Sequence, residues 1–238
     1  MATRTITENV NQAVQDFDNI KQAIIDKGIE VPNGTPTSEY ADKIGTIKIN
    51  GLDTSTVTDF SYFGQNNRFG TGEILTGLNT KSGTNFYGMF QNCKNLTTIP
   101  KLDTSNGKSF SGMFDNCSNL TTIPQLNTSK GTFFSGMFNN CSNLTTIELT
   151  SFVASQNMFS GCSALENLTV TGTITVNNND LNLSYSPKLT VESLMSVINA
   201  LSDNTGKTTY TVTLGSTNLA KLTDEQKQIA IDKNYTLA

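Results

Sequence analysis

The sequence contains no histidine and no tryptophan, and only 15% of its 238 residues are charged. Without histidine, the chain cannot form the Ser-His and Cys-His pairs that activate many nucleophiles, and it lacks the commonest metal ligand. No run approaches the roughly 18 consecutive apolar residues that predict a membrane-spanning helix. The opening stretch MATRTITENVNQ has no apolar core of the kind found in secretory signals. We therefore expect no histidine-dependent enzyme, no membrane insertion and no signal peptide.

The few charges that are present are slightly acidic in balance, with 16 lysines and arginines against 20 aspartates and glutamates. The calculated isoelectric point is near 4.8. Nucleic acids and anionic membranes both require clustered basic surface, so this balance argues against either partner. Asn, Thr, Ser and Gly replace charges on the surface, which is typical of carbohydrate-contacting and fibrous proteins. A plain threonine- and asparagine-rich β structure accounts for the same composition.

A 24-residue unit recurs through the middle of the chain. It reads GMFQNCKNLTTIPKLDTSN from Gly88, GMFDNCSNLTTIPQLNTSK from Gly112 and GMFNNCSNLTTIELTS from Gly136, and a shortened copy, NMFSGCSALENLTV, starts at Asn157. A fixed period of this length predicts a solenoid, in which each unit buries its apolar face against its neighbours. Such bodies usually present a surface to a partner and do not enclose a catalytic pocket.

Within the unit, apolar residues recur in register and predict interior columns of like residues. The four columns are Met89, Met113, Met137 and Met158; Phe90, Phe114, Phe138 and Phe159; Leu96, Leu120, Leu144 and Leu165; and Ile99, Ile123, Ile147 and Leu168. We expect the Leu-Thr-Thr-Ile segment to be the strand of each coil, because β-branched residues suit a pleated surface. Gly-Met-Phe-x-x-Cys should form a short helical or turn element, and Asp-Thr-Ser a turn. The stretch 60–72 does not match the unit and predicts an N-terminal cap.

Residues 5–28 predict one helix before the repeats. Thr5 and Glu8 fit a capping box, and Gly28 fits the position after a helix end. Its apolar residues follow the 3-4-3-4 spacing of a coiled-coil seam: Val10, Ala13, Phe17, Ile20 and Ile24. Either this seam packs on the chain's own body, or it mediates self-association or anchoring to a larger assembly.

The last fifty residues differ in character and predict an α/β C-terminal cap for the solenoid. Thr190 can cap an amphipathic helix, residues 209–214 alternate as a strand, Thr223 with Gln226 forms a second capping box, and residues 235–237 suit a final strand. The expected organisation is a helix at 1–28, a connector at 29–50, the repeats at 51–189 and the cap at 190–238.

Four cysteines occupy the same place in successive units: Cys93, Cys117, Cys141 and Cys162. Zinc sites converge on one point, whereas one cysteine per coil forms a line. Neighbouring coils are close enough for a disulfide, but parallel Cβ vectors suit its geometry poorly. We expect a structural ladder of buried free thiols that act as small apolar spacers, and no metal or cofactor.

No catalytic pattern stands out from the sequence. Asp103 recurs as Asn127, and Asp115 recurs as Asn139. A catalytic acid would not tolerate this exchange, so we expect no enzyme. A depolymerase built on a solenoid would need acids clustered on one face, and the acids here are scattered.

The repeat resembles the BspA-type leucine-rich repeat, whose units carry a Phe-x-x-Cys-x-x-Leu-x-x-Ile core. The match runs from Phe90 to Pro100 and from Phe114 to Pro124, whereas the third and fourth copies lack the proline. It covers roughly residues 75–170. The resemblance implies an α+β solenoid of the leucine-rich-repeat class, which the coiled-coil-like helix expected from the spacing in residues 5–28 would precede. Such repeats occur mostly on secreted adhesins and surface proteins.

The flanks resemble a different group of proteins. The stretch NVNQAVQDFDNIKQAIIDKGIEVPNGTPTSEYADKIGTI looks like the N-terminal segment of tail, fibre and head-fibre proteins of phages of Gram-positive bacteria. The stretch from residue 189 to 230 is similar to the C-terminal cap of leucine-rich-repeat proteins from such phages. These resemblances imply a homo-oligomeric virion protein, such as a trimeric tail fibre, that is made in the host cytoplasm and binds other virion proteins through its N-terminus.

We therefore expect a phage appendage that presents its repeats for receptor binding to a host-surface glycan or protein. The exposed polar positions expected to contact this ligand are Thr97, Lys101, Thr121, Gln125 and Thr145. A capsid-mounted head fibre or decoration protein is one alternative, and a non-viral bacterial surface adhesin is another.

Overall fold

A computed structural model describes residues 54–66, 78–178 and 180–238 of the chain. The chain divides into two units, Met1–Tyr40 and Ala41–Ala238, and every described residue belongs to the second. The boundary between the units falls inside the predicted connector. The predicted seam residues Val10, Ala13, Phe17, Ile20 and Ile24 lie outside the described residues, so their role stays a prediction.

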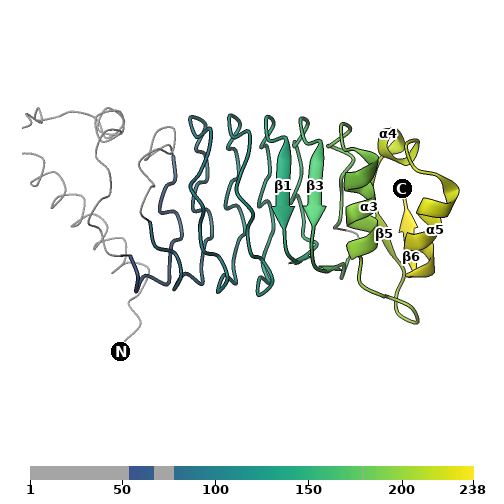
Figure 1. Ribbon diagram of the computed structural model, residues 1–238, viewed down its shortest axis with the longest axis horizontal. Helices are drawn as coiled ribbons and strands as arrows, with labels where there is room; N and C mark the ends of the chain where they lie inside the picture. The colour runs from purple at the N-terminus through teal and green to yellow at the C-terminus, as the bar shows by residue number, and fades with distance from the viewer. Residues whose placement is uncertain (1–53, 67–77, 179) are drawn as a thin grey trace, which may run out of the picture. The chain divides into compact units, whose positions relative to one another are not determined.

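Successive copies of the repeat form coils that lie side by side in chain order (Figure 1). Along the Gly-Met-Phe segment, the backbone N–H groups of Phe86 and Gly88 donate to the carbonyl oxygens of Ser109 and Ser111, at 2.8 and 2.9 Å. The same pattern recurs in the following coils, and parallel β-bridges join residues 59, 85, 109 and 133. Each coil is therefore hydrogen-bonded to the next along this side of the stack. Assignment of the stack to the leucine-rich-repeat class stays a prediction.

Two residues in each Gly-Met-Phe turn have left-handed backbone conformation. The first position holds Tyr62, Gly88, Gly112, Gly136 and Asn157, and the second holds Asn66, Asn92, Asn116, Asn140 and Gly161, with φ between 55° and 73°. Glycine and asparagine tolerate this region best. The shortened copy exchanges them, Asn first and Gly second, and so keeps the turn. This explains why the motif keeps Gly and Asn at this spacing.

The same turn corrects the expectation that residues 60–72 form a cap. Residues 60–66 form a coil of their own, in which the Tyr62 N–H donates to the Tyr87 carbonyl at 3.0 Å. The Phe60 ring stacks on Phe86 with centroids 5.7 Å apart. The sequence signal was the run Leu-Asp-Thr-Ser at 52–55, which recurs at 102–105. Residues 67–72 lie outside the described part.

All four predicted apolar columns are buried, with no side chain more than 7% exposed. Phe90, Phe114, Phe138 and Phe159 stack ring on ring at 5.6 to 5.9 Å between centroids. A fifth column was not predicted, and its rings are stacked in the same way at 5.5 to 5.7 Å: Phe60, Phe86, Phe110 and Phe134. In three of these coils a glycine precedes the phenylalanine by three residues, and a Cβ at Gly107 would collide with the Phe110 ring.

Among the described repeats, strands form only in the third copy and the shortened copy, and the first strand of each starts two residues after the predicted Leu-Thr-Thr-Ile segment does. β1 (Thr146–Leu149) pairs in parallel with β3 (Asn167–Val170), with Ile147 opposite Leu168. β2 (Phe152–Val153) pairs in parallel with β4 (Ile174–Thr175). In the two preceding copies the Leu-Thr-Thr-Ile segment forms no strand, apart from one bridge at Thr122. Pro100 and Pro124 follow those segments and have no N–H to donate, whereas Glu148 and Thr169 replace them in the strands.

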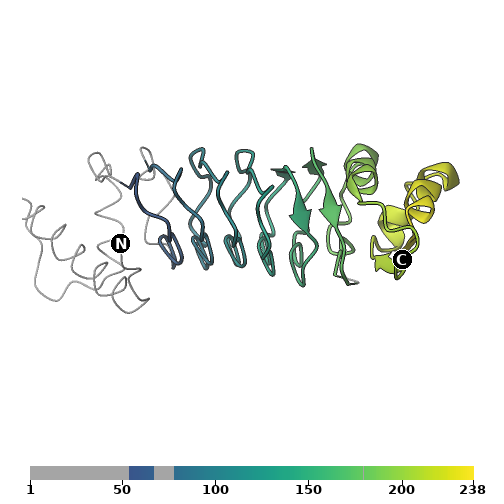
Figure 2. The same cartoon turned by 90° about the horizontal axis from the view of Figure 1, so that it is seen from below.

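α3 (Val191–Ala200) packs on β3 and covers its open edge (Figures 1 and 2). Thr190 caps this helix as predicted, and its hydroxyl accepts the N–H of Ser193. The hydroxyls of Ser193 and Ser196 accept the N–H groups of Leu168 and Val170 at 3.0 and 2.9 Å. Two helix serines therefore replace the carbonyls that another coil would supply, and pairing of β3 stops here.

The rest of the cap follows the predicted order with one addition. It comprises β5 (Tyr210–Val212), α4 (Ser216–Leu219), α5 (Asp224–Asp232) and β6 (Tyr235–Leu237). The Thr223–Gln226 capping box is confirmed, and β5 pairs in parallel with β6. The short helix α4 was not predicted. Among the described residues, no helix has the length and apolar character needed to cross a bilayer.

One degenerate coil between the repeats and α3 escaped the sequence reasoning. Leu183, Ser186 and Leu189 lie 24 residues after Phe159, Cys162 and Leu165. The Ser186 N–H donates to the Leu183 carbonyl at 3.0 Å, as the cysteine N–H does in each regular coil. The signal was hidden because serine replaces cysteine and leucine replaces phenylalanine.

Candidate functional site

A groove of about 640 Å³ crosses four neighbouring coils where the Leu-Asp-Thr-Ser segments turn. Two of the predicted ligand-binding residues, Lys101 and Gln125, line it together. The other lining residues come from the same corner of each coil: Leu78, Asn79, Thr80, Lys81, Leu102, Asp103, Thr104, Ser105, Asn127 and Thr150. The groove is open to solvent, which suits contact with an extended ligand.

The groove is built from a hydrogen-bond pattern that repeats from coil to coil. Thr80, which is buried, donates its hydroxyl to the Asp103 carbonyl at 2.9 Å, and Thr104 donates to the Asn127 carbonyl at 3.0 Å. The Asp103 carboxylate accepts the backbone N–H of Ser105 at 3.0 Å and its hydroxyl at 2.6 Å. These bonds explain the recurrence of Asp or Asn followed by Thr-Ser, and they hold the corner of each coil in one conformation.

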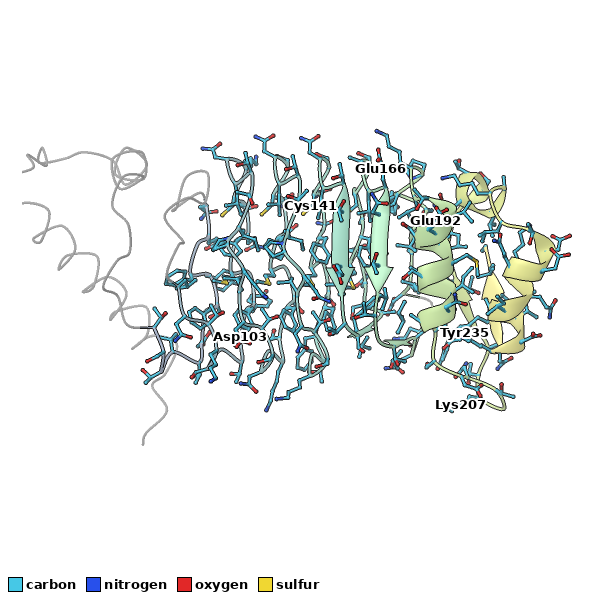
Figure 3. All side chains as sticks on the ribbon, viewed as in Figure 1. Asp103, Cys141, Glu166, Glu192, Lys207 and Tyr235 are labelled. Carbon is cyan, nitrogen blue, oxygen red and sulfur yellow. The ribbon has the colours of Figure 1, made fainter. Side chains whose placement is uncertain are left out.

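Asp103 is the carboxylate among the lining residues, and it is exposed (Figure 3). The hydroxyl and N–H of Ser105 lower its pKa below the usual range, with smaller contributions from Lys81 and Lys101. The carboxylate is therefore ionised at neutral pH. Asn127 accepts the same two bonds from Ser129, at 3.2 and 2.7 Å, so the corner needs the side-chain oxygen and not the charge.

Lysines are exposed on three neighbouring coils here, and two of them, Lys81 and Lys101, act on the Asp103 carboxylate. Lys81 and Lys101 line the groove, and Lys108 and Lys130 are exposed on the same turn segments of the next two coils. The Lys130 ammonium donates to the Asn106 side-chain oxygen at 2.7 Å, and the Asn106 amide donates to the Lys81 carbonyl at 3.0 Å. These contacts join the turns of three successive coils, which expose Lys81, Lys101, Lys108 and Lys130. We call these four lysines the lysine corner.

The predicted threonines do not line the groove. Thr97, Thr121 and Thr145 form a separate column, in which the Thr121 hydroxyl donates to the Thr97 carbonyl at 3.3 Å. The Thr145 hydroxyl donates in turn to the Thr121 carbonyl at 3.1 Å. Their hydroxyls therefore join neighbouring coils. The sequence reasoning also missed Asn79, Lys81, Asp103 and Asn127, although the recurrence of the Asp-Thr-Ser segment marked their corner.

The four cysteines form a ladder on the inside of the stack, away from the groove. The thiols of Cys117, Cys141 and Cys162 donate to the carbonyls of Phe90, Phe114 and Phe138 at 3.0 to 3.1 Å. Burial raises the pKa of Cys141 and raises that of Cys162 to about 12. Hydrogen bonding with Cys93 and burial raise the pKa of Cys117. Such thiols are weak nucleophiles at neutral pH.

Among the described residues, no group of three or more His, Cys, Asp or Glu side chains could hold a metal ion. The acids are spread over the coils and the cap, as Asp103, Glu166 and Glu192 show (Figure 3). The expectations that the protein is no enzyme and needs no cofactor stay predictions.

Residues 37–152 match the family described as "Mycoplasma protein of unknown function, DUF285". This stretch carries BspA-like repeats. The match begins within the predicted connector and ends at the start of the shortened copy, so it covers the coils that form the groove. No curated protein matches the chain, and no solved structure matches it. The family description assigns no activity, and it does not bear on the resemblance of the flanks to phage proteins.

Proposed function

We propose that the protein is a phage virion appendage, a fibre or receptor-binding protein, that contacts the host surface through its BspA-like repeats. The observation that carries this proposal is the groove itself. It is exposed, it repeats its backbone pattern across three coils, and it brings Lys101 and Gln125 together without a catalytic cluster. The proposed anchor is the predicted helix at 5–28, through the seam residues named above.

The experiment that tests this proposal is immunogold electron microscopy of particles from the source culture, with antibody against residues 78–238. Label at the tail tip is the result expected of a receptor-binding protein. Label on the capsid would instead identify a head fibre or decoration protein. Absence of label from every particle would refute a virion role. Antibody blocked with the purified protein is the control for non-specific labelling.

A non-viral bacterial surface adhesin is the second candidate, and the family match favours it. BspA-type repeats occur mostly on secreted adhesins and surface proteins. Residues 37–152 match a family described from Mycoplasma, which is a cellular organism and not a phage. Labelling of intact bacterial cells that carry no particles would support this candidate. Both candidates use the same groove for surface binding.

A further inference from the structure

Charge is unevenly distributed along the described residues, although the whole chain is weakly acidic. Residues 78–135 contain five lysines and two aspartates, whereas residues 136–238 contain five lysines and eight aspartates and glutamates. Four of the five lysines in the first stretch belong to the lysine corner. The net charge of the whole chain does not reveal the lysine corner, because its lysines come together only when three coils stack.

We propose that the lysine corner binds an anionic polysaccharide, whose sugars carry carboxylate or phosphate groups. This inference rests on the proposed host-surface function and names the ligand class of the same groove. It narrows the expected host-surface glycan or protein to a charged glycan.

The geometry favours an extended ligand over a single anion. Neighbouring coils in a parallel stack are about 5 Å apart, so cations on three coils span about 10 Å along the stack. Lys81, Lys101, Lys108 and Lys130 are all exposed. Exposed ammonium groups attract anions chiefly as point charges, and several weak attractions add along a polymer.

The surroundings favour a sugar polymer over a nucleic acid. Gln125 and Thr150 line the groove and provide amide and hydroxyl groups that can hydrogen-bond to sugar hydroxyls. The groove lining contains no aromatic side chain, and one exposed ring, Phe133, lies next to Lys108. Single-stranded nucleic acids are usually held by stacking of successive bases on several aromatic rings.

Asp103 opposes such a ligand, because its ionised carboxylate lies between Lys81 and Lys101. The next coil shows that an amide fits the same place, since Asn127 accepts the equivalent bonds from Ser129. Asp103→Asn therefore removes one negative charge and keeps the corner intact. The substitution therefore tests whether the ligand is anionic.

The test measures binding of the full chain to carboxymethyl dextran, phosphorylated dextran and unmodified dextran by calorimetry at low and high salt. We expect binding to one or both charged polymers, weakening with salt as charges are screened, and none to dextran. The charged polymer that binds more tightly shows whether the ligand's anionic groups are carboxylates or phosphates. Asp103→Asn should tighten binding about two- to fivefold, as expected for removing one like charge at an exposed site.

A variant with Lys81, Lys101, Lys108 and Lys130 changed to Gln should lose at least about tenfold in affinity, the sum of several exposed charge contacts. The matched control changes Lys94, Lys188, Lys207 and Lys227 to Gln, which alters net charge equally and should stay within about twofold. Equal loss in both variants, equal binding of dextran, or equally tight binding of single-stranded DNA would each overturn the inference.

The same variants separate this inference from the proposed function. If particles carry the protein and adsorb to host cells, but adsorption is unchanged in the lysine-corner variant, the function stands and the anionic ligand is wrong. If charged dextran binding follows the expected pattern but no particle or cell surface carries the protein, the ligand class stands and the proposed function is wrong.

Discussion

At the scale of the residue, backbone conformation explains most of the repeat. Two of the positions that keep Gly or Asn in each unit have left-handed φ, and Tyr62 is the exception that disguises the first described coil. The sequence shows that these residues recur, but it does not show that left-handed backbone conformation is the reason. The four apolar columns could be predicted because burial follows directly from the period. The fifth column was missed because Phe60, Phe86, Phe110 and Phe134 lie outside the most regular part of the unit.

The buried phenylalanine column makes a direct prediction about stability. Phe110→Ala should lower the free energy of unfolding by about 3–5 kcal/mol, since it removes a fully buried ring stacked between two others. Phe133→Ala is the matched control, because Phe133 is 64% exposed and its loss should change stability by less than about 0.5 kcal/mol. Urea unfolding followed by circular dichroism measures both. Equal effects would show that the two rings have been assigned to the wrong faces.

The buried thiols predict how stability depends on pH. Folding raises the pKa of Cys117, Cys141 and Cys162, so the unfolded chain loses these protons first as pH rises. The stabilisation that these thiols contribute is fully present below their pKa in the unfolded chain, which is about 8.5. Above that pH, the free energy of unfolding falls by about 1.4 kcal/mol per thiol for each pH unit.

Unfolding free energies measured between pH 7 and 9.5 should therefore fall above pH 8.5. A variant with Cys117, Cys141 and Cys162 changed to Ala serves as the control. It should be less stable at pH 7 but show a shallower decline. An unchanged slope in that variant would show that other groups cause the pH dependence.

At the scale of the element, the cap was predicted better than the strands. α3 and α5 start at recognisable caps and carry their own signals, so Thr190 and Thr223 sufficed to place them. The strands depend on pairing between coils. Pro100 and Pro124 remove donors at the points where Glu148 and Thr169 pair, and this effect becomes visible only when the register is known.

The edge of β3 gives the prediction at this scale. Changing Ser193 and Ser196 together to Ala should leave the N–H groups of Leu168 and Val170 without acceptors. Each unsatisfied buried group costs about 1–3 kcal/mol, so the free energy of unfolding should fall by about 2–6 kcal/mol. The uncovered edge should also promote association between chains.

Urea unfolding and light scattering check both consequences. Ser216→Ala is the control, because Ser216 is an exposed serine in the short helix α4. If the double variant unfolds at the same urea concentration as the control, the serine hydroxyls do not stabilise the edge.

At the scale of the whole molecule, the proposed assembly depends on the helix predicted at 5–28. A variant with Val10, Phe17 and Ile24 changed to Ser should lose the oligomeric mass in light scattering and fail to enter particles, because it removes a/d positions of the seam. The control changes Asn11, Gln15 and Gln22 to Ser, which lie off the seam. A seam variant that keeps the parental mass and still enters particles would contradict the anchoring role.

Period, column and cap could be predicted because they are local or repeat at a constant spacing. The 24-residue period, the buried Met, Phe, Leu and Ile columns, and the capped helices of the tail all belong to this class. Contacts between coils do not, because their register depends on how each turn closes. The tertiary structure therefore decided which of the predicted ligand-binding residues line the groove. Lys101 and Gln125 line it. The threonine column of Thr97, Thr121 and Thr145 instead joins neighbouring coils. The tertiary structure also brought Lys81, 22 residues earlier in the sequence, near Asp103, because stacking brings residues about 24 apart to within one coil spacing of each other.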